Sequence, residues 1–522
     1  MKPTHTFLAL AASAAFLISA GGAQAASTTY CVAAPGCTGT DVAGLQNALD
    51  WAQGTPEPDR LEIGPGEYFP GPGKFTYAGS ATNTLDIVGA GRDQTHLVFT
   101  SNSASLLVLD YADVSDLEVH GASPDTAFPN RPAAIDIAHG TARRLEVTNG
   151  VSGALLHDGA ALAASHVTGS GKGPDTYGVE APGFKTAVLD SVIDSPSQGA
   201  FASSSLEIAR TRISAPLGVY IHSGGNLHLT DSLIEGPAQG SNVGVFAQGS
   251  ADIQAAISGT TIVEPAPSSA GVLARGLNGG NVNVSVENSV VVAENSFVRQ
   301  SNLNPTVVTV GHSAFDPSTA LVQGPGSFDF AGTNVNVTPG FVDPAAGDYR
   351  LRPDSALIDK GAASAAGELD LAGAARSLDG DGDGSALPDI GAFESPAVAP
   401  KDPPAGDPGA PDGDPKPPVG EPAALPPALS AVSLTHRRFK VHKAATAFRF
   451  KLSEDAKVTI KVGRHKVVKA ARLGKNRIAF SGRFGRRALK PGRYVAKLTA
   501  RDAGGRASKG RRVKFKILRT EH

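Results

Sequence analysis

The chain has 522 residues, of which 41% are hydrophobic, 18% are charged and 6% are aromatic. The hydrophobic content is too high for a chain that is disordered throughout, and glycine does not recur at every third position, which excludes a collagen-like fibre. Two cysteines are too few for a disulfide-rich or cysteine-rich metal scaffold. The net charge of −2 is the sum of 47 basic and 49 acidic residues, which are unevenly distributed along the chain.

Residues 1–25 are predicted to be a signal peptide. Lys2 precedes an apolar run, and Ala23-Gln24-Ala25 provides the small residues that a signal peptidase needs. The run is too short to span a bilayer and no later stretch of 18 apolar residues occurs, so we expect a secreted or cell-surface protein with no transmembrane segment in its mature form. A retained N-terminal anchor is the alternative. Export would permit a disulfide between Cys31 and Cys37, with two free thiols as the other reading.

Residues 41–51 predict a short amphipathic helix, because Val42, Leu45, Ala48 and Leu49 recur at helical spacing. Thr40 or Asp41 could cap its N-terminus. From about residue 61 to residue 295 the pattern changes to short apolar runs separated by Gly, Ser, Asn, Asp and Pro. Few windows in this region are long enough for a helix.

These apolar runs are self-similar. The last apolar residue before each turn recurs every 20 to 29 residues, at Val119, Val147, Val167, Ile193, Ile213, Ile234, Val263 and Val291. Short strands at this period predict a solenoid, because a single coil cannot bury its inner face and must stack on the next. The Leu and Asn spacing of leucine-rich repeats is absent, and a β-propeller would need blades of about 40 residues.

Residues of the predicted helix and of the following segment 63–68 resemble the N-terminal cap of secreted right-handed parallel β-helix proteins of the pectin-lyase-like superfamily. The end of the region resembles the closing segment of many bacterial surface β-helix proteins, through Phe341–Asp343, Asp348–Leu351, Ser355–Gly361, Asp370–Gly373, Arg376 and Asp389–Glu394. The resemblance covers about residues 30–394. It implies an all-β fold with a right-handed parallel β-helix over residues 26–394, and it says more about fold than about chemistry.

Residues 395–428 contain 12 of the 37 prolines and are predicted to be a semi-rigid linker. Residues 429–522 return to alternating apolar and polar positions, which predicts a small antiparallel β-sandwich. The segment 489–505 resembles bacterial immunoglobulin-like (Ig-like) modules near their last hairpin. We call residues 429–522 the tail.

The tail carries 28 Lys or Arg against 4 Asp or Glu, a net charge of +24, which leaves −26 on the rest of the chain. Clustered cations favour binding of a polyanion, such as an anionic polymer of the cell envelope. Nucleic acid is a less favoured partner because the protein is predicted to be exported. In addition, the aromatic residues Phe448, Phe450, Phe480 and Tyr494 are predicted to lie in the core, where bases could not stack on them. The alternative interpretation is that these Lys and Arg side chains are simply exposed to solvent and bind no polyanion.

Three residues are the candidate catalytic group. Asp190, Arg210 and Asp231 each lie three positions before a marker isoleucine, so we expect them to point outward in one column with neighbours about 4.8 Å apart. His166 and Arg212 are candidates for substrate binding on the same surface. An ordinary row of cross-strand ion pairs is the competing interpretation. Asn-x-Asp, Asp-Asp and Gly-His-Gly motifs of polygalacturonase-like hydrolases are missing, as is the Trp-Ile-Asp-His stretch of pectate lyases.

The segment 379–384 alternates aspartate with glycine and matches the start of an Asp-x-Asp-x-Asp-Gly calcium loop. Asp379, Asp381 and Asp383 would be ligands, and Asp389 could replace the glutamate that the motif lacks. The alternative is a Gly-rich acidic turn without a metal.

Together these observations predict an exported surface protein that binds carbohydrate with its β-helix and an anionic envelope polymer with its tail. A polysaccharide lyase or glycoside hydrolase acting on acidic polysaccharide is the first alternative, and a structural stalk is the second. The motifs favour binding over catalysis.

Overall fold

The computed structural model describes residues 27–71, 73–99, 105–122, 132–169, 176–277, 279–363, 367–398, 429–441, 446–452, 456–463, 465–471, 474–484, 487–501, 508 and 511–518. The predicted signal peptide and most of the predicted linker lie outside these residues, so both stay predictions. The chain divides into two compact units, residues 1–405 and 406–522. No helix within the described ranges is both long and apolar enough to cross a membrane.

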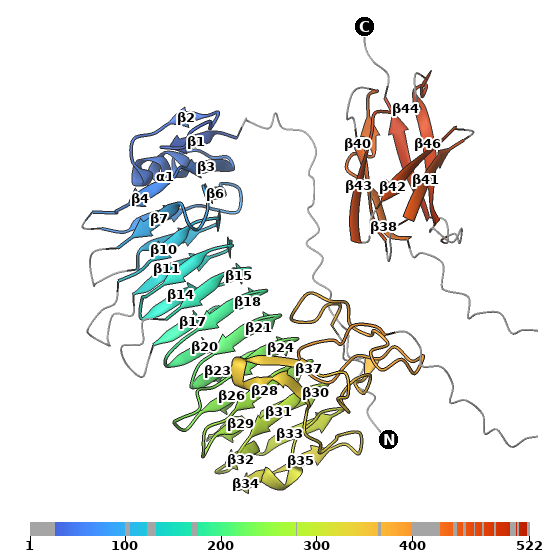
Figure 1. The fold of residues 1–522 in the computed structure, drawn as a ribbon. Helices are drawn as coiled ribbons and strands as arrows, with labels where there is room; N and C mark the ends of the chain where they lie inside the picture. Colours follow the sequence, from blue (N-terminus) through green and yellow to red (C-terminus); the bar gives the residue numbers. More distant parts are fainter. Residues whose placement is uncertain are drawn as a thin grey trace, which may run out of the picture. The chain divides into compact units, whose positions relative to one another are not determined.

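The first unit is a parallel β-helix of stacked coils (Figure 1), which confirms the predicted all-β class. From β3 to β33 each coil contributes one strand to each of three long sheets, so hydrogen-bonded neighbours in this range are three strands apart in the chain. We name the sheets A, B and C in the order in which a coil passes through them. The strands of sheet A are β2 (Thr40–Asp41), β1 (Thr29–Val32), β3 (Asp59–Ile63), β6 (Leu85–Gly89), β9 (Ala112–Ser115), β12 (Thr141–Arg143), β15 (Ala161–Ala163), β18 (Thr186–Leu189), β21 (Ser205–Ala209), β24 (Asn226–Thr230), β27 (Ile253–Ser258), β30 (Val282–Glu287), β33 (Thr306–Gly311) and β35 (Gly326–Phe330).

Sheet B comprises β4 (Gly66–Tyr68), β7 (Thr95–Val98), β10 (Glu118–His120), β13 (Glu146–Thr148), β16 (His166–Thr168), β19 (Val192–Asp194), β22 (Arg212–Ser214), β25 (Leu233–Glu235), β28 (Thr261–Glu264) and β31 (Val290–Ala293). Sheet C comprises β5 (Phe75–Ala78), β8 (Leu107–Asp110), β11 (Ala133–Ala138), β14 (Ser152–Leu156), β17 (Tyr177–Ala181), β20 (Gln198–Ala202), β23 (Leu217–His222), β26 (Val243–Gly249), β29 (Ala270–Gly276), β32 (Asn295–Ser301) and β34 (Leu321–Gln323).

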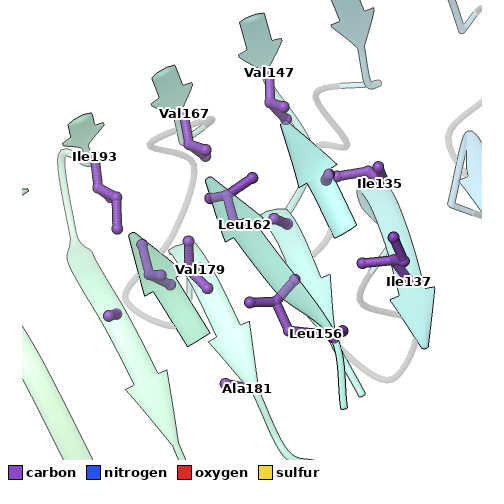
Figure 2. Close-up of a cluster of buried hydrophobic side chains, with 14 of the residues drawn as sticks. Ile135, Ile137, Val147, Leu156, Leu162, Val167, Val179, Ala181 and Ile193 are labelled. Carbon is purple, nitrogen blue, oxygen red and sulfur yellow. The ribbon is translucent and has the colours of Figure 1, made fainter. Parts of the chain in front are cut away.

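The marker residues stack as predicted, with one exception. The sheet B register aligns Val119, Val147, Val167, Ile193, Ile213, Ile234, Ile262 and Val291 in one inward column. Val147, Val167 and Ile193 stand in line on successive strands and face Leu162 of sheet A and Val179 of sheet C (Figure 2). The choice of Val263 was wrong by one residue. A one-residue shift turns a side chain to the opposite face of a strand, so Val263 packs outside the coil against Tyr349.

The cap helix α1 (Leu45–Gln53) is shorter than predicted at its N-terminus. Thr40 and Asp41 are extended and pair with β1, so the helix begins after Gly44, which provides no side-chain cap. Leu45, Ala48 and Leu49 are buried as expected and cover the first coil. Cys31 and Cys37 form a disulfide beside this cap.

The turn between sheets A and B uses a left-handed backbone residue in almost every coil. The φ angle at this position lies between 43° and 61° in Asp116, Arg144, Ala164, Asp190, Arg210, Asp231, Gly259, Asn288 and His312. The residue after it is often Ser or Thr, whose hydroxyl accepts the N–H of the equivalent residue one coil earlier. Ser165, Ser191 and Ser232 are examples, with N···O distances of 3.0 to 3.2 Å. The buried backbone at this corner is therefore satisfied by a ladder of hydroxyl groups.

The closing segment, residues 332–398, folds back over the outer face of sheet B at its last coils (Figure 1). It contains the strands β36 (Phe341–Asp343) and β37 (Asp348–Leu351) and, between them, the 3-10 turn η2 (Pro344–Ala346). Another 3-10 turn, η1 (Pro317–Thr319), precedes the segment. Tyr349 packs on Leu233 and Val263, and Leu357 and Ile390 pack with Val290. The outer face of sheet B is apolar where it is covered.

The tail forms two small sheets around one apolar core. One consists of β38 (Leu429–Leu434), β40 (Thr446–Leu452) and β43 (Gly474–Phe480). The other, which we name the basic sheet, runs in the order β39 (Arg438–Phe439), β47 (Arg511–Ile517), β46 (Gly492–Arg501), β41 (Ala456–Val462) and β42 (His465–Ala471). A short pair, β44 (Arg483–Phe484) and β45 (Arg487–Ala488), lies beside them. All pairings are antiparallel except that of β39 with β47. The Ig-like class stays a prediction.

Candidate functional site

The predicted column of Asp190, Arg210 and Asp231 exists, at the corner between sheets A and B. All three occupy the left-handed position of successive coils. Arg210 donates two hydrogen bonds to the carboxylate of Asp190, at 2.6 and 2.9 Å. Asp116 and Arg144 form the same bidentate pair nearer the N-terminus, at 2.6 and 2.5 Å. This arrangement matches the competing interpretation of a row of ion pairs.

Asp231 is not open to a substrate. It is 3% exposed and lies beneath the closing segment. The guanidinium of Arg376 donates to Asp231 Oδ1 at 2.7 and 3.1 Å, and also to the backbone oxygens of Gly259 and Gly391. Burial raises the pKa of Asp231 more than Arg376 lowers it. The structure therefore uses Asp231 to anchor the closing segment and does not join it to Asp190 and Arg210 in an accessible group.

His166 and Arg212 lie on the outer face of sheet B, separated by Val192 of the intervening strand. His166 contacts Glu146 through Nδ1 at 2.7 Å and Asp194 through Nε2 at 2.9 Å. Arg212 donates to Glu235 at 2.8 Å, close to the edge of the closing segment. Both side chains are held by carboxylates, and neither is placed beside the Asp190–Arg210 pair by a contact that the structure shows.

The outer face of sheet C carries a different column, which the sequence analysis did not identify. Its register aligns Asp136, Leu155, Glu180, Phe201, Tyr220 and Phe246 on six successive strands from β11 to β26. Neighbouring strands are about 4.8 Å apart. We name this column, together with His157 and Arg275 beside it, the sheet C strip. Acidic groups occupy its first half and aromatic rings its second half.

The acidic half of the strip holds a histidine between charges. His157 Nε2 lies 3.1 Å from Asp136 Oδ1, and Glu180 accepts a hydrogen bond from the hydroxyl of Ser152 at 2.6 Å. The hydrogen bond with Asp136 is the main cause that raises the pKa of His157, and the charges of Asp136, Asp158 and Glu180 act in the same direction. A half-exposed histidine oriented by a carboxylate is a group that can carry a proton at near-neutral pH.

The aromatic half of the strip is continuous. Phe201 meets Tyr220 edge-on with ring centroids 5.4 Å apart, and Tyr220 stacks on Phe246 at 4.9 Å with an interplanar angle of 11°. The Arg275 guanidinium lies 5.1 Å from the Phe246 centroid. Gln248 connects the two kinds of group, because it donates to the Tyr220 hydroxyl at 2.9 Å and accepts from Arg275 at 3.2 Å. All three rings are partly exposed.

The sequence did contain a signal for this column. Leu155, Glu180, Phe201, Tyr220 and Phe246 each stand two positions after a glycine. These glycines are Gly153, Gly178, Gly199, Gly218 and Gly244, and Gly271 continues their series on the next coil. A Cβ on any of these glycines would lie 2.2 to 2.4 Å from an inward side chain of sheet B, so the corner between sheets B and C excludes larger residues. Aligning the coils on these glycines would have placed Glu180, Phe201, Tyr220 and Phe246 in one column.

The acidic loop brings together only part of the predicted metal set. Carboxylate oxygens of Asp359, Asp379 and Asp381 lie within 4.8 Å of one another and could hold a metal ion. Asp383 and Asp389 are not members of this cluster. Asp389 is buried and accepts the N–H of Asp359 at 2.8 Å and that of Ser395 at 2.6 Å.

The cluster also has internal partners. The buried Asp359 accepts the N–H groups of Gly380 and Asp381 at 2.9 and 3.0 Å, and Lys360 Nζ lies 3.6 Å from Asp381. Oxygen-only donors fit calcium better than a softer cation. Three carboxylates and one nearby ammonium group give the cluster a net negative charge, which favours a bound cation.

No protein-family model matches the chain, and no curated protein matches its sequence. Several solved structures resemble it. The A-module of the Azotobacter vinelandii mannuronan C-5 epimerase AlgE6 is 15% identical over 57% of this chain and 96% of that chain, with a TM-score of 0.40. An alginate lyase from Paenibacillus sp. str. FPU-7 is 11% identical over 56% and 98%, with a TM-score of 0.28.

The catalytic unit of the GH87 α-1,3-glucanase from Streptomyces thermodiastaticus strain HF3-3 is 16% identical over 62% of this chain and 70% of that chain, with a TM-score of 0.27. Likenesses this weak do not carry the activities of those proteins to this chain. The β-helix fold is evident from the strand pairing itself, and the sheet C strip is the candidate site on its surface.

Proposed function

We propose that this protein is exported and binds a polysaccharide along the sheet C strip, while its tail binds an anionic polymer of the cell envelope. The observation that supports binding is the row of Phe201, Tyr220 and Phe246 on consecutive coils. Sugar rings have apolar C–H faces and polar edges, so they fit exposed aromatic rings flanked by hydrogen-bonding side chains such as Gln248 and Arg275. A solenoid repeats such a surface along its axis, which suits a polymer.

The proposal is tested by retention of the full chain on neutral and acidic polysaccharides. Replacing Tyr220 and Phe246 by alanine is expected to weaken binding about tenfold or more, because two ring contacts are lost. The matched control is Phe184→Ala, because Phe184 is 68% exposed and lies outside the strip. Unchanged binding by the double variant, with an unchanged unfolding midpoint, would refute the proposed surface. Absence of any retained glycan would leave the stalk as the remaining reading.

A second candidate function is cleavage of an acidic polysaccharide, which is favoured by the contact between His157 and Asp136 beside Glu180. In this case His157 would transfer the proton and Asp136 would orient the imidazole. Incubation with acidic polysaccharides, followed by assays for unsaturated and reducing ends, tests this function. His157→Gln should abolish any such products while retention on the polymer persists. Products that survive this substitution would exclude the assignment of His157.

A further inference from the structure

One face of the basic sheet in the tail carries a row of like charges. Lys466, Lys461, Lys497 and Arg512 stand directly opposite one another on β42, β41, β46 and β47. All four side chains are exposed. Neighbouring strands are about 4.8 Å apart, so the row extends for roughly 14 Å across the sheet. We name these four residues the cation row.

This pairing is unfavourable for the domain alone. Like charges directly opposite each other on adjacent strands destabilise a sheet, and opposite charges are the usual arrangement. The tail has four acidic residues, Glu454, Asp455, Asp502 and Glu521, and all four lie outside the described residues. A sheet that only needs a soluble surface could alternate its charges or use neutral polar side chains. The arrangement is favourable when a bound polyanion lies across the strands.

A hollow of about 560 Å³ continues the same charge along β46 and β47 toward β39. Five cations line it, Arg437, Arg438, Arg493, Lys514 and Lys516. Arg493 stands opposite Lys516, which in turn stands opposite Arg438, so the like-charge pairing recurs here.

The apolar side chain exposed among these cations is that of Val495, which stands opposite Lys514 and is 45% exposed. Tyr494 and Phe515 alternate with the cations along β46 and β47, so their rings lie on the core side of the sheet. Guanidinium groups pair with phosphate or carboxylate in bidentate fashion, and Val495 can contact the apolar face of a sugar ring.

We infer that this face of the basic sheet is a binding site for an anionic glycopolymer, with one charged unit in the hollow and successive phosphate or carboxylate groups on the cation row. The inference rests on the tail's part in the proposed function and narrows it to named residues. Single-stranded nucleic acid fits less well, because it needs exposed aromatic rings for its bases. Phe439, Phe448, Phe450, Phe480 and Phe515 are at most 5% exposed, and Tyr494 is half-buried.

The test compares two full-chain variants that lose the same charge. The row variant carries Lys461→Gln, Lys466→Gln and Lys497→Gln. The control carries Arg449→Gln, Arg477→Gln and Lys490→Gln, at exposed tail positions outside the row. Affinities are measured at 150 mM salt for polyphosphate, polygalacturonate, neutral dextran and single-stranded DNA. The row variant should bind the tighter ligand of polyphosphate and polygalacturonate about tenfold more weakly than the parent chain does, and the control variant should bind it within about twofold of the parent chain.

The four probes and the two variants distinguish the possible outcomes. Tighter binding to polyphosphate identifies phosphate as the recognised group, and tighter binding to polygalacturonate identifies carboxylate. Equal weakening of both triple variants would overturn the site, because only net charge would then matter. Tightest binding to DNA would overturn the ligand class. If the parent chain binds no anionic probe, the tail's part in the proposed function is refuted as well. If only the Tyr220 and Phe246 variant loses binding to polysaccharide, the site on the tail is unaffected. An unfolding midpoint of the row variant at or above that of the parent chain excludes misfolding.

Discussion

Arg376 shows how a single residue joins distant parts of the chain. Its side chain is 2% exposed, and it reaches Asp231 in the turn between sheets A and B and Glu394 near the end of the closing segment, at 2.7 and 3.5 Å. Three buried charges and the backbone oxygens of Gly259 and Gly391 satisfy one another. Residues 376 and 389–394 belong to the part of the sequence that most resembles bacterial surface β-helix proteins. Their contacts give these residues a structural role, because they hold the closing segment against the β-helix.

Replacing Arg376 by Met is therefore expected to destabilise the β-helix unit by about 3–5 kcal/mol, because two carboxylates would stay buried without their cation. Arg350→Met is the control, since Arg350 pairs with Asp348 at the surface, where a pair contributes less than about 1 kcal/mol. Urea unfolding measures both free energies. Equal effects of the two substitutions would contradict the role given to Arg376.

Glu264 makes the stability depend on pH. It is fully buried at the end of β28, and burial is the main cause that raises its pKa to about 8. The amide of Asn242 lowers this pKa, but no well-formed hydrogen bond reaches either carboxyl oxygen from the described residues. The folded state therefore favours the neutral acid. Its stabilising contribution is full below the ordinary glutamate pKa of about 4.5 and is lost as the pH rises through about 8.

We expect the unfolding free energy of the parent chain to fall by about 2–4 kcal/mol between pH 5 and pH 9. Glu264→Gln should remove most of this fall, whereas the exposed Glu368→Gln should not. Burial also raises the pKa of Asp389 and Glu394, so part of the pH dependence should persist in the variant. A variant that follows the parent curve throughout would show that Glu264 is ionised in the folded protein.

At the scale of elements, the glycines that recur from Gly153 to Gly271 determine how closely neighbouring coils pack at the corner between sheets B and C. A Cβ on Gly199 would lie 2.3 Å from Cγ2 of Ile213 and 2.5 Å from the backbone oxygen of Gly218. The neighbouring coil supplies both atoms, so neither can move without disturbing the stack. Six successive coils, from β14 to β29, have glycine at this place, which leaves room for the close approach.

Gly199→Ala is expected to cost about 2–4 kcal/mol of stability through this overlap. Gly332→Ala serves as the control, because nothing lies within 4 Å of its added Cβ, and its effect should stay within about 0.5 kcal/mol. Thermal unfolding compares the two variants. A tolerated Gly199→Ala would mean that the corner is looser than the close approach indicates.

The acidic loop of the closing segment gives a metal prediction. Calcium should raise the melting temperature of the β-helix unit, and EDTA should reverse the effect, because the carboxylates of Asp359, Asp379 and Asp381 converge. Asp381→Asn should abolish the response, and Asp383→Asn should preserve it because Asp383 lies outside the cluster. A response lost in Asp383→Asn and retained in Asp381→Asn would favour the sequence motif over the geometry.

The sequence predicted elements better than it predicted sites. The period of apolar residues was sufficient for the stack of Val147, Val167 and Ile193, because burial must recur once per coil. It failed at Val263, where two adjacent apolar residues offered two registers. The shared column of Asp190, Arg210 and Asp231 followed from the same period. The partner of Asp231 did not, because Arg376 lies 145 residues from it in the chain.

At the scale of the whole molecule, the two units differ in core and in charge. The apolar core of the β-helix and that of the tail are separate clusters. The net charge of the tail is +24 and that of the remaining chain is −26. Each unit therefore offers its own kind of surface, an aromatic and acidic strip in one and a cationic sheet in the other. This difference is the basis of the proposal that the two units bind ligands of different chemistry.

The measurement that tests the central claim most directly is hydroxyl-radical footprinting of the full chain with and without a retained polysaccharide. The proposal predicts that oxidation of Tyr220 and Phe246 falls when the polymer binds, while oxidation of the exposed Phe184 is unchanged. Unchanged oxidation of Tyr220 and Phe246 in the bound state, with protection at His166 on sheet B instead, would contradict the assignment of the sheet C strip.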